Sequence, residues 1–259
     1  MGLLDGQVAV ITGAGSGIGR SIAIHYAQEG AAVVVADVNE QAAQAVVAEL
    51  PKTMQKSIAV GVDVTSKASC KSLYKTVYEN YGRIDIAGHN AGVSTMNRIV
   101  DLSEQEWDFN MNVNAKGVFL CTQAVLPYMM EQGRGRIINT ASMAGKRGTP
   151  LLAHYAASKW AVIGFTKSTA LEVAEYGITV NCVCPGFVKT GMQEREVVWE
   201  AELRGMQPQE VLAEYIRLTP LKRIQTAEDV ARIYVFLASR LADFVTGEAV
   251  DVTGGADLV

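Results

Sequence analysis

Short apolar runs alternate with longer amphipathic stretches along the whole chain. The short runs are rich in valine, isoleucine and alanine and are bounded by glycine, aspartate or asparagine, which is typical of buried strands. Strands are therefore expected at residues 8–12, 32–37, 57–62, 84–88, 136–140, 179–184 and 249–252.

Helical periodicity fills the intervals between these strands. Helices are expected at residues 18–29, 40–50, 66–81, 104–132, 154–176 and 227–239, and a mixed insertion with helix-prone charged stretches is expected at about 187–219. Pro127 is expected to bend or divide the helix in which it lies. Because the alternation has no composition break, it predicts one α/β domain over residues 1–259, a Rossmann-like parallel sheet of about seven strands with helices on both faces.

The turn after the first strand is rich in glycine. Residues 12–19 form the sequence Thr-Gly-Ala-Gly-Ser-Gly-Ile-Gly. Its glycines would allow backbone N–H groups to approach a pyrophosphate at the helix N-terminus. The residues expected to bind the cofactor here are Gly13, Ser16, Gly17, Ile18 and Gly19. The spacing G-x-x-x-G-x-G differs from the common dinucleotide fingerprint, so a glycine-rich turn without a ligand is the alternative. A phosphate-binding first turn and about seven strands also argue against a TIM barrel.

Asp37 closes the second expected strand, 18 residues beyond Gly19, and Val38 follows it. A carboxylate at this place can accept hydrogen bonds from both adenosine ribose hydroxyls and would repel a 2′-phosphate. No lysine or arginine neighbours Asp37 in the sequence. The pattern favours NAD over NADP, while a cap for the next helix is an alternative or additional role for Asp37.

Tyr155 and Lys159 are four residues apart in an expected helix, so the phenol and the ammonium can lie on one face. A nearby cation lowers the pKa of a phenol, which would make Tyr155 a general base or acid at ordinary pH. Ser142 follows the expected strand 136–140 and can place its hydroxyl opposite the phenol. The Tyr-x-x-x-Lys pattern also occurs by chance in many helices, so its meaning depends on the rest of the chain.

Composition narrows the class of partner. The chain is 49% hydrophobic, its formal net charge is −4, and it has no run of lysine or arginine. These features argue against a nucleic-acid or anionic-membrane partner, and no apolar run approaches the ~20 residues of a membrane span. The four cysteines lack metal-binding spacing, so we expect no metal and buried free thiols in a cytoplasmic protein. They are Cys70, Cys121, Cys182 and Cys184.

Several motifs in order give the chain a resemblance to the short-chain dehydrogenase/reductase family over nearly all of its 259 residues. They are Thr12 to Gly19, Asp63-Val64, Asn90-Ala91-Gly92, Val113-Asn114, Ser142, Tyr155 to Lys159, and Pro185-Gly186 with Thr190. The resemblance implies a doubly wound sheet in the order 3-2-1-4-5-6-7 and a homotetramer. The chain departs from the family pattern at His89, to which we assign no role beyond packing, and at Thr253.

The resemblance also implies roles for individual residues. Tyr155 would take the alcohol proton, Ser142 would hold the substrate oxygen, and Lys159 would stabilise the phenolate and hold the nicotinamide ribose. Asn114 would hold a water that connects Lys159 to solvent, or would relieve a helix irregularity. The remaining cofactor contacts would be Asp63 and Val64 at the adenine, Asn90, Ala91 and Gly92 along the ribose, and Pro185, Gly186, Val188 and Thr190 around the carboxamide.

The substrate is the least determined part of the prediction. The pocket is expected to be lined by Ser94, Met143, His154, Met192 and Trp199. Lys146 and Arg147 are expected to be solvated loop charges, with a phosphate site as the alternative. Residues 174–180, 220–223 and 252–255 are similar to members that oxidise sorbitol or related polyols. We therefore expect an NAD-dependent dehydrogenase of a polyol, sugar alcohol or vicinal diol. The alternatives are an NADPH-dependent ketoreductase of acyl-carrier thioesters or small ketones, and a non-catalytic dinucleotide-binding regulator.

Overall fold

Seven parallel strands form one sheet in the computed structural model, which describes residues 2–52 and 56–258. Their order is β3-β2-β1-β4-β5-β6-β7, so the predicted Rossmann-like topology is confirmed. The strands are β1 Val8–Thr12, β2 Ala32–Asp37, β3 Ile58–Gly61, β4 Ile86–His89, β5 Gly135–Thr140, β6 Ile178–Pro185 and β7 Ala249–Val252.

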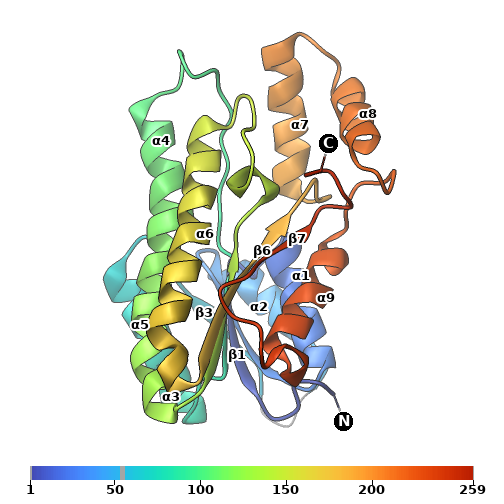
Figure 1. Cartoon of the computed structure of the whole chain (residues 1–259). Coiled ribbons are helices and arrows are strands. Elements are labelled where there is room, and N and C mark those ends of the chain that lie inside the picture. The colour runs from blue at the N-terminus through green and yellow to red at the C-terminus, as the bar shows by residue number, and fades with distance from the viewer. Residues whose placement is uncertain (1, 53–55, 259) are drawn as a thin grey trace.

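Helices cover both faces of this sheet (Figure 1). They are α1 Gly17–Gln28, α2 Glu40–Glu49, α3 Lys67–Tyr81, α4 Glu104–Asn110, α5 Gly117–Gln132, α6 Ala153–Val173, α7 Gly191–Arg204, α8 Pro208–Leu218 and α9 Ala227–Ala238. One hydrophobic core lies between the sheet and α1, α2 and α9, and a second lies between the sheet and α3, α5 and α6.

The central strand β1 shows how the sequence builds two cores. All five of its residues are buried. Ala9 and Ile11 belong to the core beneath α1 and α9, whereas Val8 and Val10 belong to the core beneath α3 and α5. Successive side chains of a strand point to opposite faces, so a strand covered on both sides must be apolar throughout.

The expected helix over 104–132 is divided, but not at Pro127. A π-helix, Met111–Lys116, lies between α4 and α5, and Pro127 lies inside α5. The division follows from Asn114, whose amide is hydrogen-bonded to the backbone of Val93 on both its oxygen and its nitrogen. A π-turn holds one extra residue, and the buried Asn114 gives that turn polar partners outside the helix.

The predicted insertion at 187–219 forms α7 and α8, which stand beyond the carboxyl ends of the strands (Figure 1). The two helices have a small hydrophobic core of their own, made by Val197, Ala201, Val211 and Tyr215. The Tyr215 ring stacks on Phe187 at a centroid distance of 4.0 Å. This pair of helices covers the edge of the sheet at which all the strands end.

His89 is a packing residue at the end of β4. Its ring nitrogens lie 2.9 Å from the Tyr74 hydroxyl and 2.9 Å from the Asn139 amide oxygen. Burial lowers the pKa of His89 to about 4, so the ring is neutral at ordinary pH. The polar network therefore joins α3 to β4 and β5 without a buried charge.

The four cysteines are free and buried, as predicted. In the part of the chain that the structure describes, no helix is both long and apolar enough to cross a membrane.

Candidate active site

A cavity of about 1850 Å³ opens at the carboxyl ends of the strands, beneath α7 and α8. Most of the residues predicted to form the site line it. They are Gly13, Ser16, Gly17, Ile18, Asp37, Val38, Asp63, Val64, Asn90, Ala91, Gly92, Ser142, Met143, Tyr155, Lys159, Pro185, Gly186, Val188, Thr190 and Met192. The parallel topology explains this gathering, because it brings the ends of distant strands to one edge.

The turn between β1 and α1 is shaped for a close approach of backbone groups. Gly13 has a φ of +63°, and a Cβ there would lie 2.6 Å from Ala91 Cα. A Cβ on Gly19 would lie 2.1 Å from the Gly13 carbonyl oxygen, so this glycine packs beneath the turn rather than lining the cavity. Among the described residues of the first turn of α1 there is no acidic side chain, and the Ser16 hydroxyl makes no cap bond. The turn can therefore accept a pyrophosphate.

Asp37 holds its carboxylate at the rim of the cavity. One oxygen accepts a hydrogen bond from Gly15 N at 2.8 Å and the other accepts from Asn39 N at 2.9 Å. Helix α2 is capped by Asn39, which accepts from Ala42 N, so Asp37 is not its cap. Among residues 2–52 and 56–258, no lysine or arginine forms an ion pair with Asp37. The site therefore presents an uncompensated negative charge beside the phosphate turn.

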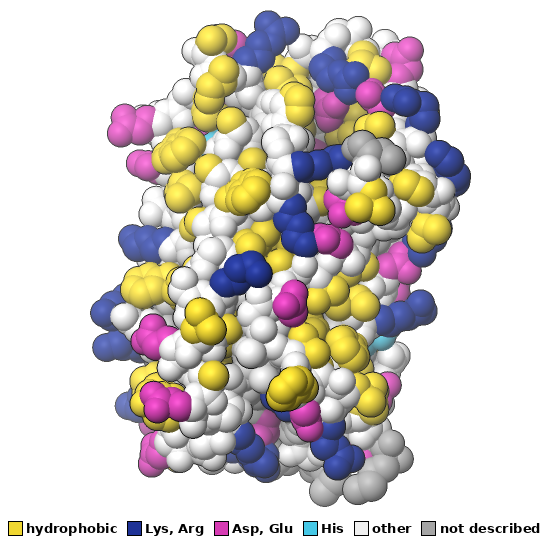
Figure 2. Space-filling view, viewed as in Figure 1, with side chains coloured by type: hydrophobic (Ala, Val, Ile, Leu, Met, Phe, Trp, Pro, Cys, Tyr) yellow, Lys and Arg dark blue, Asp and Glu magenta, His cyan; other side chains and the backbone are white. Residues whose placement is uncertain are grey.

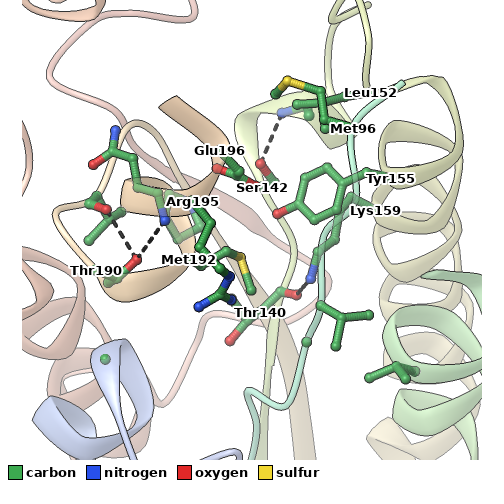
Figure 3. Close-up of a pocket in the computed structure, with 18 of the residues that line it drawn as sticks. Met96, Thr140, Ser142, Leu152, Tyr155, Lys159, Thr190, Met192, Arg195 and Glu196 are labelled. Carbon is green, nitrogen blue, oxygen red and sulfur yellow. Dashed lines mark hydrogen bonds between the residues drawn. The ribbon is translucent and has the colours of Figure 1, made fainter. Parts of the chain in front are cut away.

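Three side chains converge at the centre of the cavity. Ser142 follows β5 and starts a short 3-10 helix, Met143–Gly145, where its hydroxyl accepts from Ala144 N at 3.2 Å. Tyr155 lies in the first turn of α6, and Lys159 lies one turn further on. Figure 3 shows the Ser142 and Tyr155 hydroxyls pointing into the same space, with Lys159 beneath them. The Lys159 ammonium donates to the Thr140 carbonyl at 2.9 Å and lies 5.6 Å from the centroid of the Tyr155 ring.

The electrostatics of this group differ from the expectation. Burial raises the pKa of Tyr155 well above its usual value, and the nearby Glu196 raises it further, while the hydrogen bond with Ser142 lowers it. Burial also lowers the pKa of Lys159 to about 8. The lower phenol pKa expected beside the Lys159 cation is therefore not found in the polypeptide, because burial of Tyr155 raises its pKa.

Asn114 lies outside the cavity lining but close to Lys159. Its amide nitrogen donates to the Val93 carbonyl and to the Ser158 hydroxyl. A Cβ on Gly92 would lie 3.3 Å from the Asn114 amide oxygen and 3.5 Å from Lys159 Nζ. The Asn114 amide and the Lys159 ammonium therefore flank Gly92. The hydrogen bonds of Asn114 to Val93 and Ser158 are those expected of a residue that relieves a helix irregularity.

Three residues predicted for the substrate pocket do not line the cavity, namely Ser94, His154 and Trp199. His154 is fully buried, with Nε2 at 2.7 Å from the Thr95 hydroxyl. The His154 side chain points away from the cavity because adjacent residues of a helix project in different directions, and Tyr155 is the one that faces the cavity. Trp199 borders a separate pocket of about 420 Å³ on another side of α7. Ser94 is buried, with no hydrogen-bond partner for its hydroxyl in the described chain.

Glu196 was not predicted, although it lies in the cavity near Tyr155. It comes from α7, and Figure 3 places it beside Ser142 and across from the phenol. Burial raises the pKa of Glu196. The sequence did hold a signal, because Met192 and Glu196 are four residues apart and share a helix face.

Lys146 and Arg147 are not the solvated loop charges that the sequence suggested. The Lys146 ammonium donates to the Ala249 carbonyl and to Asp251, both at 2.6 Å. Arg147 donates to the Ala256 carbonyl at 2.6 Å. Both side chains tie the loop after Ser142 to β7 and to the segment beyond it.

The described residues hold no group of three or more histidine, cysteine, aspartate or glutamate side chains that could bind a metal ion.

Comparison with known proteins supports an enzyme site. The profile described as short chain dehydrogenase matches residues 7–201. A 3-oxoacyl-[acyl-carrier-protein] reductase of Thermotoga maritima is 38% identical over 252 residues, which is 97% of this chain and 98% of the relative. A (2S)-[(R)-hydroxy(phenyl)methyl]succinyl-CoA dehydrogenase subunit of Thauera aromatica is 38% identical over 98% of both chains. The crystal structure of levodione reductase superposes with a TM-score of 0.93 at 34% identity, covering 99% of both chains.

Lys159→Met tests the energetic cost of the buried ammonium. A pKa lowered from 10.5 to about 8 implies a penalty of about 3 kcal/mol, from which the lost bond to Thr140 subtracts about 1 kcal/mol. The variant should therefore be more stable by about 1–3 kcal/mol in urea denaturation at pH 7 while losing turnover. The pKa of Lys159 is lower in the folded state than in the unfolded state, so burial of its charge destabilises the wild type fully below about pH 8. The stability difference between the variant and the wild type should therefore fade between about pH 8 and 10.5.

Lys167→Met is the matched control, because Lys167 also lies on α6 and donates to a backbone carbonyl but is exposed. Its stability should change by less than about 0.5 kcal/mol. An equal gain in both variants would show that burial of the Lys159 charge is not the cause.

Proposed function

Because the chain belongs to the short-chain dehydrogenase/reductase family, whose members are oxidoreductases of alcohols and ketones that bind a nicotinamide dinucleotide, we propose that it transfers hydride between NAD(H) and a secondary alcohol. The proposed substrate is in particular a polyol, sugar alcohol or vicinal diol. The convergence of Ser142, Tyr155 and Lys159 on one face of the cavity carries the proposal. The cofactor supplies the hydride acceptor or donor, and the protein supplies position and proton transfer.

The choice of NAD over NADP rests on Asp37. Its two oxygens are held by the N–H groups of Gly15 and Asn39, which fix the carboxylate at the end of β2. A carboxylate held there can accept hydrogen bonds from ribose hydroxyls, whereas a 2′-phosphate would meet an unneutralised charge. The adenine would lie between Asp63 and Val64, and the carboxamide would lie among Pro185, Gly186, Val188 and Thr190, all of which line the cavity.

The catalytic roles follow from the geometry at Tyr155. In oxidation the phenolate oxygen takes the proton of the alcohol, and Ser142 orients the alcohol oxygen by a hydrogen bond. Lys159 holds the nicotinamide ribose and places a positive charge beneath the phenol. Burial raises the pKa of Tyr155 in the polypeptide, and the positive charge of a bound oxidised nicotinamide would favour the phenolate. Asn114 would hold a water near Lys159 and connect it to solvent.

The substrate end of the cavity supports a small hydroxylated compound. Its walls combine Met96, Met143, Met192 and Leu152 with the Ser142 hydroxyl and the Glu196 carboxylate. Apolar walls with a few convergent polar groups suit a small neutral molecule that carries more than one hydroxyl.

Reduction of a thioester-linked ketone is the second candidate. Several relatives that are 38–39% identical to this chain are named as acting on acyl-carrier-protein or CoA substrates. Such a substrate would reach the centre through the open side of the cavity and would fit the same Ser142 and Tyr155 hydroxyls. This second candidate differs from the oxidation of a polyol in two ways. Its substrate needs a wide entrance to the cavity, and it does not require Glu196.

We also propose that the protein is a homo-oligomer, a tetramer by family resemblance, in the cytoplasm. Large apolar side chains are exposed on α5 and α6, including Phe119, Trp160 and Leu171. Figure 2 shows hydrophobic side chains spread over this side of the molecule. Exposed aromatic residues of this kind are typical of a surface that another subunit covers. Four buried free thiols are in keeping with a reducing compartment.

Asp37→Ser tests the cofactor. The wild type should prefer NAD over NADP in kcat/KM, and the variant should lose about 10- to 100-fold of that preference, because hydrogen bonds to a charged group contribute about 1.5–3 kcal/mol. Initial rates with both cofactors at saturating substrate measure the change. A wild type that prefers NADP would contradict the assignment and favour the second candidate.

Tyr155→Phe tests the proton-transfer role and the non-catalytic alternative. Turnover should fall by about 10²- to 10⁴-fold, the usual contribution of general acid–base catalysis. NADH binding, followed by its fluorescence, should stay within about threefold of the wild type because the ring is retained. Normal turnover by this variant, or the absence of any turnover in the wild type over a panel of polyols, diols, ketones and thioesters, would refute the proposal.

Sedimentation velocity tests the oligomer. The wild type should sediment well above the 27.8 kDa of one chain, and the double substitution Phe119→Glu with Trp160→Glu should produce lighter species. Two buried negative charges at an apolar contact are strongly unfavourable. A wild type that sediments as a monomer would rule out this interface.

A further inference from the structure

Glu196 is held over the reacting centre by the insertion that covers the cavity. It lies on α7, one helical turn beyond Met192. It is partly buried, and its carboxylate is close enough to Tyr155 to raise the pKa of that phenol. Figure 3 shows it on the opposite side of the substrate space from α6. A substrate whose oxygen lies between Ser142 and Tyr155 would therefore meet this carboxylate with another of its atoms.

The carboxylate is not neutralised by an ion pair. Among the residues that the structure describes, no lysine or arginine lies within ion-pair distance of Glu196, although Glu200 on the same helix is paired with Arg204. Arg195, which is exposed and also lines the cavity, favours the ionised form of Glu196, and Glu200 opposes it. The buried Ser94 hydroxyl lies beside the carboxylate, short of hydrogen-bond geometry, and also favours its charged form. A carboxylate has about four acceptor sites, so Glu196 keeps acceptor capacity for a ligand in the cavity in addition to its approach to Ser94.

The neighbouring charges decide which ligand group fits. Lys159 lies in the floor of the cavity, and a positive nicotinamide would bind beside it, so a cationic substrate would be repelled from that side. A substrate carboxylate would be repelled by Glu196 itself. A neutral group that donates a hydrogen bond satisfies the acceptor without either penalty.

We propose that Glu196 is a specificity-determining residue that accepts a hydrogen bond from a second hydroxyl of the substrate, so that the enzyme selects diols and polyols over simple secondary alcohols. This inference rests on the proposed function and adds the group that distinguishes one alcohol from another. Met96, Met192 and Leu152 surround the same space with apolar walls, which strengthens a hydrogen bond to a charged acceptor.

The test compares two substrates that differ by one hydroxyl, butane-2,3-diol and butan-2-ol, with NAD as the oxidant. The wild type should favour the diol in kcat/KM, and Glu196→Leu should reduce this ratio by about 10- to 100-fold. Glu196→Gln, which is nearly isosteric and keeps one acceptor oxygen, should reduce it less. Loss of the Glu196 charge also changes the pKa of Tyr155, which alters the oxidation of both alcohols alike. The ratio of the two kcat/KM values cancels this shared effect.

Glu194→Gln is the matched control, because Glu194 lies on α7 but is exposed and does not line the cavity. It should leave the ratio unchanged. A second readout is the kcat/KM for 3-hydroxybutyrate, an anionic alcohol, divided by that for butan-2-ol. This ratio should be at least fivefold higher in Glu196→Gln than in the wild type because a like charge has been removed. Thermal unfolding and NADH binding verify that each variant is folded.

An unchanged diol ratio in Glu196→Leu, with NADH binding intact, would overturn the role of Glu196 and leave the proposed function standing. A wild type that favours butan-2-ol would overturn both the role of Glu196 and the preference for diols and polyols in the proposed function, whereas hydride transfer from a secondary alcohol would stand. A wild type that oxidises no secondary alcohol with NAD would instead contradict the proposed function, and this inference would fall with it.

Discussion

The buried bond between the Lys159 ammonium and the Thr140 carbonyl is the interaction on which the site depends. It joins α6 to the end of β5, and so fixes the helix that carries Tyr155 against the strand that leads to Ser142. Burial of the charge is energetically costly, because the ammonium is almost fully removed from water and its pKa falls to about 8, and the bond to Thr140 offsets only part of this cost. The fold thus holds a destabilising charge, which places a cation beneath the Tyr155 phenol.

The parallel sheet supplies the frame for this arrangement. The phosphate turn follows β1, Asp37 ends β2, Ser142 comes after β5, and the Pro185-Gly186 segment comes at the end of β6, so groups far apart in the chain meet at one edge. Helices α7 and α8 then cover that edge with a small core of their own. The groups proposed to act in hydride transfer thus lie at the strand ends and at the start of α6, whereas α7 contributes Met192 and Glu196, to which we assign substrate selection.

Local patterns predicted much of this structure. The seven strands and the helices between them appear within a few residues of their expected positions, because burial on both faces of a parallel sheet demands continuous apolar runs. The turn at residues 12–19 and the Tyr155–Lys159 pair follow from spacing alone. The sequence predicted that the helix over 104–132 would be interrupted at Pro127, but the interruption lies at residues 111–116. Its cause is the hydrogen bond between the Asn114 side chain and the backbone of Val93.

The sequence by itself determined the order of the elements, the glycine-rich turn and the Tyr155–Lys159 pair, since each depends on short spacings along one element. Only the tertiary structure decided the protonation energetics and the substrate end. Burial, which raises the pKa of Tyr155 and lowers that of Lys159, is a sum over many distant neighbours. The position of Glu196 depends on how the insertion folds back over the sheet, and the directions of His154 and Trp199 depend on which helix face the packing leaves open.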